Sequence, residues 1–397
     1  MGKIEKKIIF FIEKNRNILF FLIVSLLGAA ARYVGGRFAS GDMHGCLVPW
    51  YEEIASKGGF KSLKEQVGDY NILYQTIIAL MTYVKINCVV LYKALSIVFD
   101  YLLAFSSAYF VCELSSKKKF DMVFNCVYAT ILLFPTVVLN SAFWGQCDSI
   151  YSFFLIMTLL FLFKEKYYLA FVFLGIAFAF KLQAIFIIPF LIFYYLYKKK
   201  FSIFMTLISV VVFWFSGIIA YINGRNLLAP FTIYFSQTGT YEKMYLNVTS
   251  FWILLGNNYE FMKGFAILFT IVILGIGLYL ILSKKVEVRT PYQFVTIAAW
   301  GIWVCVFFLP AMHERYTYLL DILLIIAAFL DKKYVKYAVV SCSLSLLTYG
   351  NYLFDNGGVD KLCVLLYLAS WLHFSYTILC GYRNEKESLE EVKKKNC

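Results

Sequence analysis

The side chains that could carry chemistry are few, and they gather in short polar segments between long apolar runs. The acidic residue of "SGDMHG" is Asp42, and that of "NSAFWGQCDSIY" is Asp148. A carboxylate in such a place can take a proton from a hydroxyl group as a general base. Either residue can instead serve only the helix that follows it, because Asp at a helix start suits both the cap and the dipole. The sequence leaves both alternatives open.

Basic side chains lie in two further polar segments. Lys181 interrupts "FAFKLQAIF", and His313 and Arg315 belong to "MHERY". Arginine can bind a phosphate through two parallel hydrogen bonds, and a histidine adds a further donor. We therefore expect these three side chains to bind a phosphate group. The alternatives are a lysine that snorkels to lipid headgroups and an Arg315–Glu314 pair that anchors a helix end.

Polar and aromatic side chains of these segments, and of "GDYNILYQ" at 68–75, could bind a sugar. Amide groups hydrogen-bond to sugar hydroxyls and aromatic rings can stack on a sugar face, although Trp is also common at membrane interfaces. The residues expected to contact a sugar or an acceptor are Trp144, Gln146, Gln183, Glu314, Tyr316, Tyr70 and Asn71.

The elements that position these residues must be membrane helices. The chain has 397 residues, of which 61% are hydrophobic and only 15% are charged, and its mean hydropathy is +0.72. A soluble domain of this length could not bury so much apolar surface. We predict an all-α polytopic membrane protein of one domain over residues 1–397. No small-residue cleavage site follows the first apolar run, so we expect that run to be a retained span.

Apolar runs bounded by charged residues predict twelve crossings. They cover residues 17–36, 88–112, 122–140, 149–163, 167–181, 184–197, 201–222, 262–282, 292–310, 316–330, 334–350 and 361–381. The run over 70–84 has about fourteen residues, short of the ~20 that a crossing helix needs, so we predict an interfacial helix there. A second interfacial helix is predicted from Pro49.

The distribution of charge fixes the predicted topology. The short loops near Lys117, Lys164, Lys198, Lys284 and Lys332, with the two termini, carry most of the 37 Lys and Arg residues. The positive-inside rule therefore places the N-terminal segment 1–16 and the tail 382–397 in the cytoplasm. The loops 37–87 and 223–261 then lie outside, together with every polar segment described above. The residue usage suggests a bacterial cytoplasmic membrane.

Charge and cysteine content exclude other classes of partner. The net charge of +13 would suggest nucleic acid on a soluble protein, but here the positive-inside rule accounts for it. The ten cysteines include no CxxC pair and lie mostly inside apolar runs, so we expect small apolar side chains rather than metal ligands. We predict no cofactor. A divalent metal is possible but not demanded by these residues.

Carboxylates, sugar-binding groups and phosphate-binding cations on one outer face suit glycosyl transfer from a sugar on a lipid phosphate. Nucleotide sugars are cytoplasmic, so an activated sugar that is used outside must arrive on a membrane lipid. A base takes the proton of the acceptor hydroxyl, and cations stabilise the leaving phosphate. We expect a polyprenyl-phosphate sugar as donor and a glycan, lipid or protein as acceptor.

The chain also resembles the GT-C glycosyltransferases, most closely the bacterial relatives of the mannosyltransferase that adds the second mannose of GPI anchors. The similarity spans Phe20 to Leu330. It is carried by "SGD" at 40–42, "PWYEEI" at 49–54, "GDYNILY" at 68–74, "NSAFWGQCDSIY" at 140–151, "FKLQAIFIIP" at 180–189 and "HERY" at 313–316.

The resemblance implies an inverting hexosyltransferase, with mannose favoured, and a long first outer loop that carries interfacial helices. The catalytic Asp of that loop maps to Asp42, and the acidic position of the second loop maps to Asp148. The basic motif that binds the lipid phosphate maps to His313–Arg315. The first loop lacks the paired D-x-D of some relatives, which puts a metal dependence in doubt.

Two other functions compete with this interpretation. A transporter or flippase of a lipid-linked sugar would place ionisable groups inside its spans, as Lys93, Asp100 and Asp321 are predicted to lie. These residues could also form structural pairs, and no internal repeat is visible. A scaffold subunit without chemistry would leave the acidic outer loops unexplained.

Overall fold

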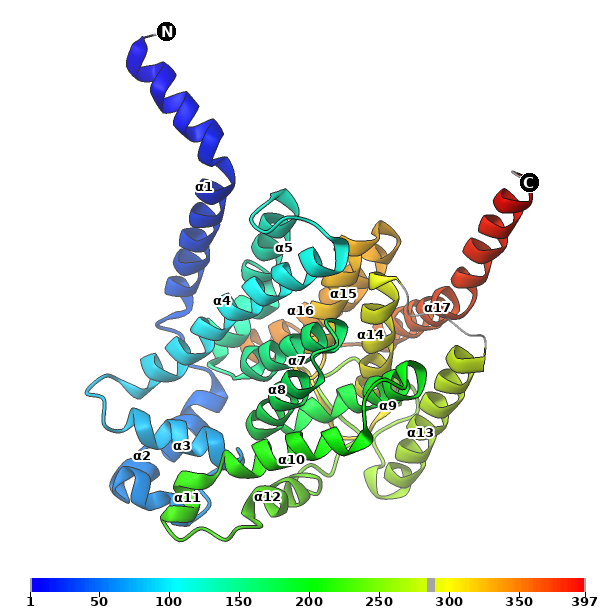
Figure 1. The fold of residues 1–397 in the computed structure, drawn as a ribbon. Coiled ribbons are helices and arrows are strands. Elements are labelled where there is room, and N and C mark those ends of the chain that lie inside the picture. Colours follow the sequence, from blue (N-terminus) through cyan, green and yellow to red (C-terminus); the bar gives the residue numbers. More distant parts are fainter. Residues whose placement is uncertain (1, 284–289, 396–397) are drawn as a thin grey trace. The chain divides into compact units, whose positions relative to one another are not determined.

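The computed structural model describes residues 2–283 and 290–395, with side chains up to residue 379 in the last helix (Figure 1). The predicted basic loop at Lys284 and the last two residues of the predicted tail lie outside the described residues. The chain forms two compact units, and the single domain over 1–397 stays a prediction. The first unit comprises residues 1–181 and 209–230, and the second comprises 182–208 and 231–397.

Almost all of the described secondary structure is helical, as predicted. The elements up to residue 181 are α1 (Lys3–Gly35), η1 (Met43–Leu47), α2 (Val48–Ser56), η2 (Gly59–Lys64), α3 (Ile72–Met81), α4 (Cys88–Ser115), α5 (Met122–Leu132), α6 (Pro135–Val138), η3 (Leu139–Trp144), α7 (Asp148–Phe163) and α8 (Tyr167–Phe180). Then follow η4 (Leu182–Ile187), α9 (Ile188–Lys198), η5 (Ile203–Met205), α10 (Thr206–Phe215), α11 (Ile218–Ile222), α12 (Ala229–Gln237), β1 (Tyr245–Leu246), η6 (Phe251–Leu254), α13 (Tyr259–Ser283), α14 (Pro291–Phe308), β2 (Met312–His313), α15 (Tyr318–Leu330), η7 (Lys332–Tyr334), α16 (Val335–Phe354) and α17 (Lys361–Lys395).

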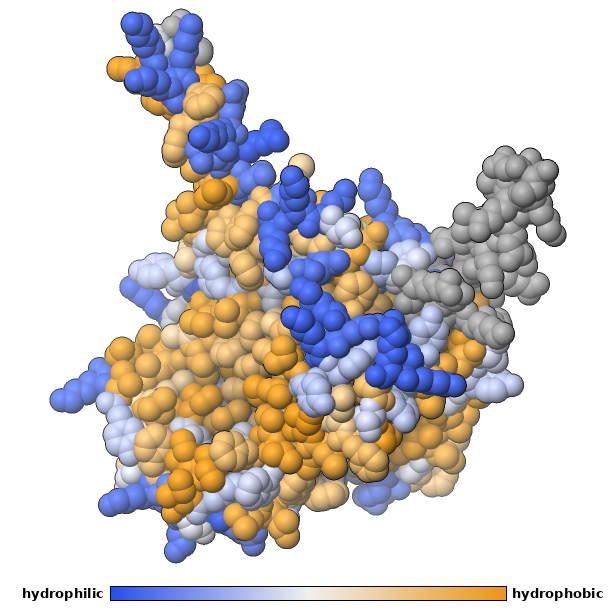
Figure 2. All heavy atoms as spheres, in the orientation of Figure 1, coloured by the Kyte–Doolittle hydropathy of each residue, from blue (hydrophilic) through white to orange (hydrophobic). Residues whose placement is uncertain are grey.

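Every run predicted as a crossing contains a helix, but fewer helices have the length of a full crossing. Among the described residues, five helices are long and apolar enough to span a membrane, and the bent pair of α5 with 135–144 would make a sixth. These helices are compatible with an integral membrane protein. The number of twelve crossings stays a prediction, because α7, α8, α9, α10 and α15 are short apolar helices. Figure 2 shows hydrophobic side chains over much of the visible surface.

The two helices predicted to lie at the interface are present. Helix α2 has nine residues and begins with Pro49 in its first turn, and α3 has ten residues, which at 1.5 Å each is too short to cross a bilayer. Helix α1 differs from its prediction, because it begins at Lys3 and includes most of the segment 1–16. Its buried residues Val24, Gly28, Arg32 and Gly35 recur at helical spacing on the C-terminal half, so only that half packs against the unit.

Helix α4 forms the core of the first unit, with α5 and α7 packed against it, and α7 and α8 lie side by side (Figure 1). Phe154 and Phe161 of α7 contact Phe173 of α8, with ring centroids 6.0 and 5.3 Å apart. In the second unit α14 is buried along nearly its whole length, from Gln293 to Phe308. A helix that is apolar all round has no face for water, which explains its central place.

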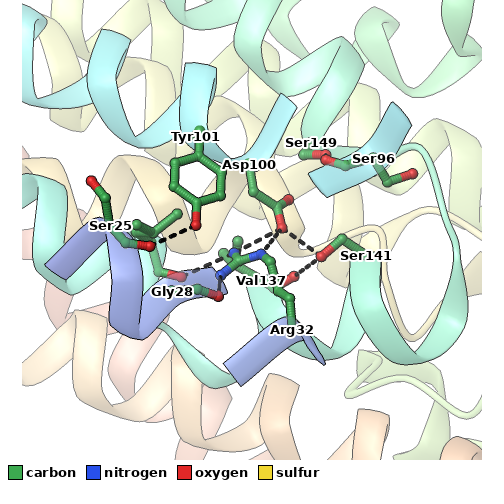
Figure 3. A network of polar contacts seen from close by, with 10 residues as sticks. Ser25, Gly28, Arg32, Ser96, Asp100, Tyr101, Val137, Ser141 and Ser149 are labelled. Carbon is green, nitrogen blue, oxygen red and sulfur yellow. Dashed lines mark hydrogen bonds and ion pairs between the residues drawn. The ribbon is translucent and has the colours of Figure 1, made fainter. Parts of the chain in front are cut away.

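An ion pair joins α1 to α4 inside the first unit (Figure 3). Arg32 Nε donates to Asp100 Oδ2 at 2.8 Å, and Ser141 Oγ donates to the same oxygen at 2.5 Å. Arg32 is 2% exposed and Asp100 is fully buried. The guanidinium also donates to the carbonyl oxygen of Leu132 at 3.0 Å, where α5 ends before Pro135. It therefore satisfies a backbone acceptor that the helix break leaves open.

Lys93 does the same for the end of α1. Its Nζ donates to the carbonyl oxygens of Gly35 at 2.8 Å and Phe38, and to that of Gly36 at 3.4 Å. The residues that the rival transporter interpretation places in a span, Lys93 and Asp100, thus both hold the end of α1 against α4. This is a structural use of both charges.

Replacement of Arg32 by Met should lower the free energy of unfolding by about 3–5 kcal/mol, because Asp100 stays buried without its counter-charge. The double variant Arg32→Met, Asp100→Asn should recover more than half of that loss. Unfolding in mixed detergent micelles, followed by circular dichroism, measures both. Arg16→Met, an exposed site on the same helix, should change stability by less than about 0.5 kcal/mol. Equal losses in the single and double variants would contradict the pairing.

Candidate functional site

The Asp42 carboxylate is held by two donors from a distant segment. It lies half-buried at the start of η1, and its Oδ2 accepts hydrogen bonds from Trp144 Nε1 and Gln146 Nε2, both at 2.9 Å. Its side chain makes no cap hydrogen bond to η1, and Ser40 Oγ accepts from the Met43 amide instead. The capping alternative for Asp42 is therefore wrong. Both donors are neutral, so they orient the carboxylate rather than compensate its charge.

Tyr70 extends this arrangement from a third segment. Its hydroxyl donates to Gln146 Oε1 at 2.8 Å, so the amide of Gln146 connects Tyr70 to Asp42. Tyr70 is half-buried, and its ring contacts Trp50 edge-on at 5.7 Å and Tyr74 at 4.6 Å. Asp42 and Tyr70 are the members of this group that a substrate can reach, because Trp144 is fully buried and Gln146 is 2% exposed.

The turn that carries the two donors depends on a glycine. The π-helix η3 ends at Gly145, whose φ of +76° lies in the left-handed region. A Cβ at this position would lie 2.4 Å from Met43 Cε. A side chain is thus disfavoured mainly by the backbone conformation, and the end of the Met43 side chain would also have to move. Ser40 Oγ also donates to the carbonyl oxygen of Trp144 at 3.1 Å, which fixes the two segments together.

Asp148 and Lys181 are buried against each other. Lys181 Nζ forms an ion pair with Asp148 Oδ1, and Asn140 Nδ2 donates to Asp148 Oδ2 at 2.8 Å. Asp148 is fully buried and Lys181 is 6% exposed. Asp148 is the first residue of α7, so its charge lies in the first helical turn, as the dipole alternative predicted, and Lys181 does not snorkel outward. In this arrangement the two charges bind each other, and the predicted roles of Asp148 in catalysis and of Lys181 in phosphate binding stay predictions.

The pair is linked to the Asp42 arrangement through Asn140. The backbone amide of Gln146 donates to the Asn140 carbonyl oxygen at 2.9 Å, while the Asn140 side chain binds Asp148. Asp148 and Lys181 therefore support the same turn that presents Trp144. The sequence singled out both residues, and the structure adds that they are linked to this turn through Asn140.

Asn71 and Tyr74 are two further buried polar residues of the first unit. Asn71 is 2% exposed, caps α3 by accepting from the Ile72 amide at 2.8 Å, and donates to the Pro230 carbonyl oxygen at 2.9 Å. Its predicted contact with a sugar is disfavoured by these bonds. Tyr74 was missed by the sequence reasoning, although "GDYNILY" contains it. Burial raises the pKa of its phenol well above the ordinary value, so the buried hydroxyl stays neutral beneath Tyr70.

The remaining predicted residues belong to the second unit. His313 lies in β2, which pairs in parallel with β1 so that Leu246 is opposite His313. Its ring lies 4.4 Å from that of Tyr241 and 5.2 Å from that of Tyr316. The pairing of the loop 223–261 with the "HERY" segment was not foreseen from the sequence. A two-residue strand leaves no readable alternation in a sequence.

The other predicted groups of this unit have different degrees of burial. Glu314 is 3% exposed, with one carboxylate oxygen 3.9 Å from His313 Nδ1, whereas Arg315 and Tyr316 are half-buried. Gln183 is half-buried in η4, and its neighbour Phe186 contacts Tyr316 at 6.2 Å. The binding of a donor phosphate by His313 and Arg315, and of a sugar by Gln183, stays a prediction.

Known proteins add no assignment. No model of a protein family matches the chain, and no curated protein matches it. Within residues 2–283 and 290–395, no group of three or more His, Cys, Asp and Glu side chains could hold a metal ion.

Gly145→Ala should lower the free energy of unfolding by at least about 1 kcal/mol, because alanine is strained at this φ and its Cβ displaces Met43. Thermal unfolding in detergent measures the loss. Gly41→Ala is the matched control, since a Cβ there meets nothing within 4 Å. Equal melting temperatures for the two variants would show that the turn tolerates a side chain.

Lys181→Met should destabilise the fold by about 3–5 kcal/mol, because it leaves the Asp148 charge buried alone. Adding Asp148→Asn should restore most of the loss. If Lys181 instead binds a phosphate, the single variant would stay stable and the double variant would bring no recovery. Melting temperatures of the two variants, measured without substrate, decide between these roles.

Proposed function

We propose that this chain is a membrane glycosyltransferase of the GT-C type. In this proposal a hexose, with mannose favoured, moves from a polyprenyl-phosphate sugar to an acceptor hydroxyl on the extracytoplasmic side. The observation that supports it is the half-buried Asp42 carboxylate, which buried neutral donors orient beside the half-buried Tyr70. The acceptor is a glycan, a lipid or a protein. The twelve crossings, with both termini cytoplasmic, are part of the same proposal.

Asp42 would act as the general base. Its carboxylate takes the proton of the acceptor hydroxyl while that oxygen attacks the anomeric carbon, and the bond from that carbon to the lipid phosphate breaks. One displacement inverts the configuration. Trp144 and Gln146 keep one oxygen of Asp42 fixed, so little reorganisation is needed when the proton moves. Tyr70 is the residue of the first unit best placed to contact the sugar or the acceptor.

The developing charge on the leaving phosphate needs cations. The proposal keeps His313 and Arg315 in that role. It does not keep Lys181, which is bound to Asp148 inside the first unit.

A transporter of a lipid-linked sugar is the second candidate, and Asp321 favours it. This carboxylate is 1% exposed within α15, and Ser341 Oγ donates to its Oδ1 at 2.6 Å. In the part of the chain that the structure describes, no Lys, Arg or His forms an ion pair with it. An ionisable residue in an apolar helix often marks an ion or substrate pathway. The enzyme is preferred because Lys93 and Asp100 have structural uses.

Purified protein in proteoliposomes, given labelled polyprenyl-phosphate mannose or glucose with candidate acceptors, should form a new glycoside. In Asp42→Asn the side-chain oxygen can still accept the hydrogen bonds from Trp144 and Gln146, but the general base is lost. The kcat should therefore fall by about 10²–10⁴ with little change in KM. Glu52→Gln changes an exposed carboxylate of the same loop and should retain activity.

Near-normal turnover of Asp42→Asn would remove Asp42 from catalysis. Movement of the intact labelled lipid across the vesicle, without a glycoside product, would favour the transporter. In that case Asp321→Asn should stop the movement while Asp42→Asn leaves it unchanged.

A further inference from the structure

Arg225 is a buried cation that the proposed reaction does not use. It follows α11 in the first unit, is 8% exposed, and donates from Nη2 to Gln66 Oε1. Its Nη1 is buried and has no hydrogen-bond partner among the described residues. Burial lowers the pKa of Arg225, but an arginine still carries its charge at neutral pH. A buried guanidinium nitrogen without a partner is costly, so its environment is suited to an anionic ligand.

The surroundings of Arg225 add positive charge. Helix η2, which packs against α11, carries the exposed residues Lys61 and Lys64. The aliphatic part of Lys64 lies beside Gly224, since a Cβ on that glycine would be 3.8–3.9 Å from three of its carbons. The negative charge of Glu65 also acts on Arg225. Glu65 is exposed, however, and its carboxylate forms an ion pair with Lys57 Nζ at 3.1 Å.

Apolar side chains flank this cation on both sides in the chain. Ile222 is 79% exposed, Leu227 is 54% exposed and Leu228 is 63% exposed. Large aliphatic side chains so exposed next to a buried arginine are typical of a segment at the membrane surface, where hydrocarbon and phosphate are both within reach. The predicted topology also places this segment at an outer membrane surface.

We propose that Arg225 and Lys64 bind the phosphate of a membrane lipid, whose chains lie along Ile222, Leu227 and Leu228. Arginine supplies hydrogen bonds in a fixed plane, and the flexible lysine supplies a second charge. The shared chemistry is a phosphate ester on an apolar chain, which both phospholipids and polyprenyl phosphates offer. The site is separate from Asp42 and does not depend on glycosyl transfer.

Bound lipid would also steady the loop that holds Asp42. Gln66 Oε1 accepts from Arg225, while Gln66 Nε2 donates to the carbonyl oxygens of Gly68 at 2.7 Å and Tyr70 at 3.0 Å. Tyr70 in turn donates to Gln146 at 2.8 Å. A ligand that fixes Arg225 therefore fixes Gln66, one hydrogen bond away from the Tyr70 backbone.

Native mass spectrometry of the full-length protein, released from detergent, tests the site by titration with phosphatidylglycerol. Arg225→Gln should weaken its binding at least about tenfold, and Lys64→Gln should weaken it by a smaller factor. Arg37→Gln, which removes an exposed arginine from the same unit, is the matched control and should have no effect. Diacylglycerol with the same chains lacks the phosphate. It should therefore bind equally well to the unchanged protein and to Arg225→Gln.

Three further results are informative. Unchanged phosphatidylglycerol binding in both Arg225→Gln and Lys64→Gln would overturn the proposal. If inorganic phosphate blocks the Arg225-dependent binding at the same concentration as the lipid, the proposal that the ligand is a lipid would be overturned. Ile222, Leu227 and Leu228 would then contribute nothing to the affinity. Polyprenyl phosphate that binds more tightly than phosphatidylglycerol, and loses affinity in Arg225→Gln, would support the site and identify the preferred lipid. Lys64 is exposed, so its variant should fold even if Arg225→Gln does not.

Discussion

The structure depends on satisfying backbone polar groups where helices break inside an apolar protein. A break exposes carbonyl and amide groups, and no water is available inside a hydrocarbon environment to bind them. Arg32 binds the end of α5, and Lys93 binds three carbonyl groups at the end of α1. Both cations are buried. Lys93 belongs to α4, and Arg32 forms an ion pair with Asp100 of α4. These two buried cations of the first unit thus serve the backbone.

The candidate site is built from such breaks. The two π-helices η1 and η3 meet where Met43 approaches Gly145, and their side chains bring Asp42 to Trp144. Irregular helix turns of this kind are frequent at functional sites, because they direct side chains that a regular helix would place elsewhere. Buried side chains hold the geometry, and the half-buried Asp42 and Tyr70 are left to meet a substrate.

Charge alone was a poor guide to role in this chain. Lys181 was expected to bind a phosphate and instead pairs with Asp148, while Arg225 drew no attention in the sequence and lies buried with an unfilled donor. Both are single basic residues next to apolar stretches. What separates them is the partner each one finds, because an ion pair that is complete inside the protein has nothing left to offer a ligand.

The helices follow from the sequence, since long apolar runs bounded by charge permit few other structures, and each predicted run contains a helix. The sequence also singled out the segments that carry Asp42, Trp144, Gln146 and Tyr70, because polar side chains are conspicuous among apolar neighbours. Only the tertiary structure decided which of them meet. Asp42 and Trp144 are 102 residues apart, and Arg225 and Gln66 are 159 apart. Such pairs depend on where helices bend and how they pack, which hydropathy along the chain does not encode.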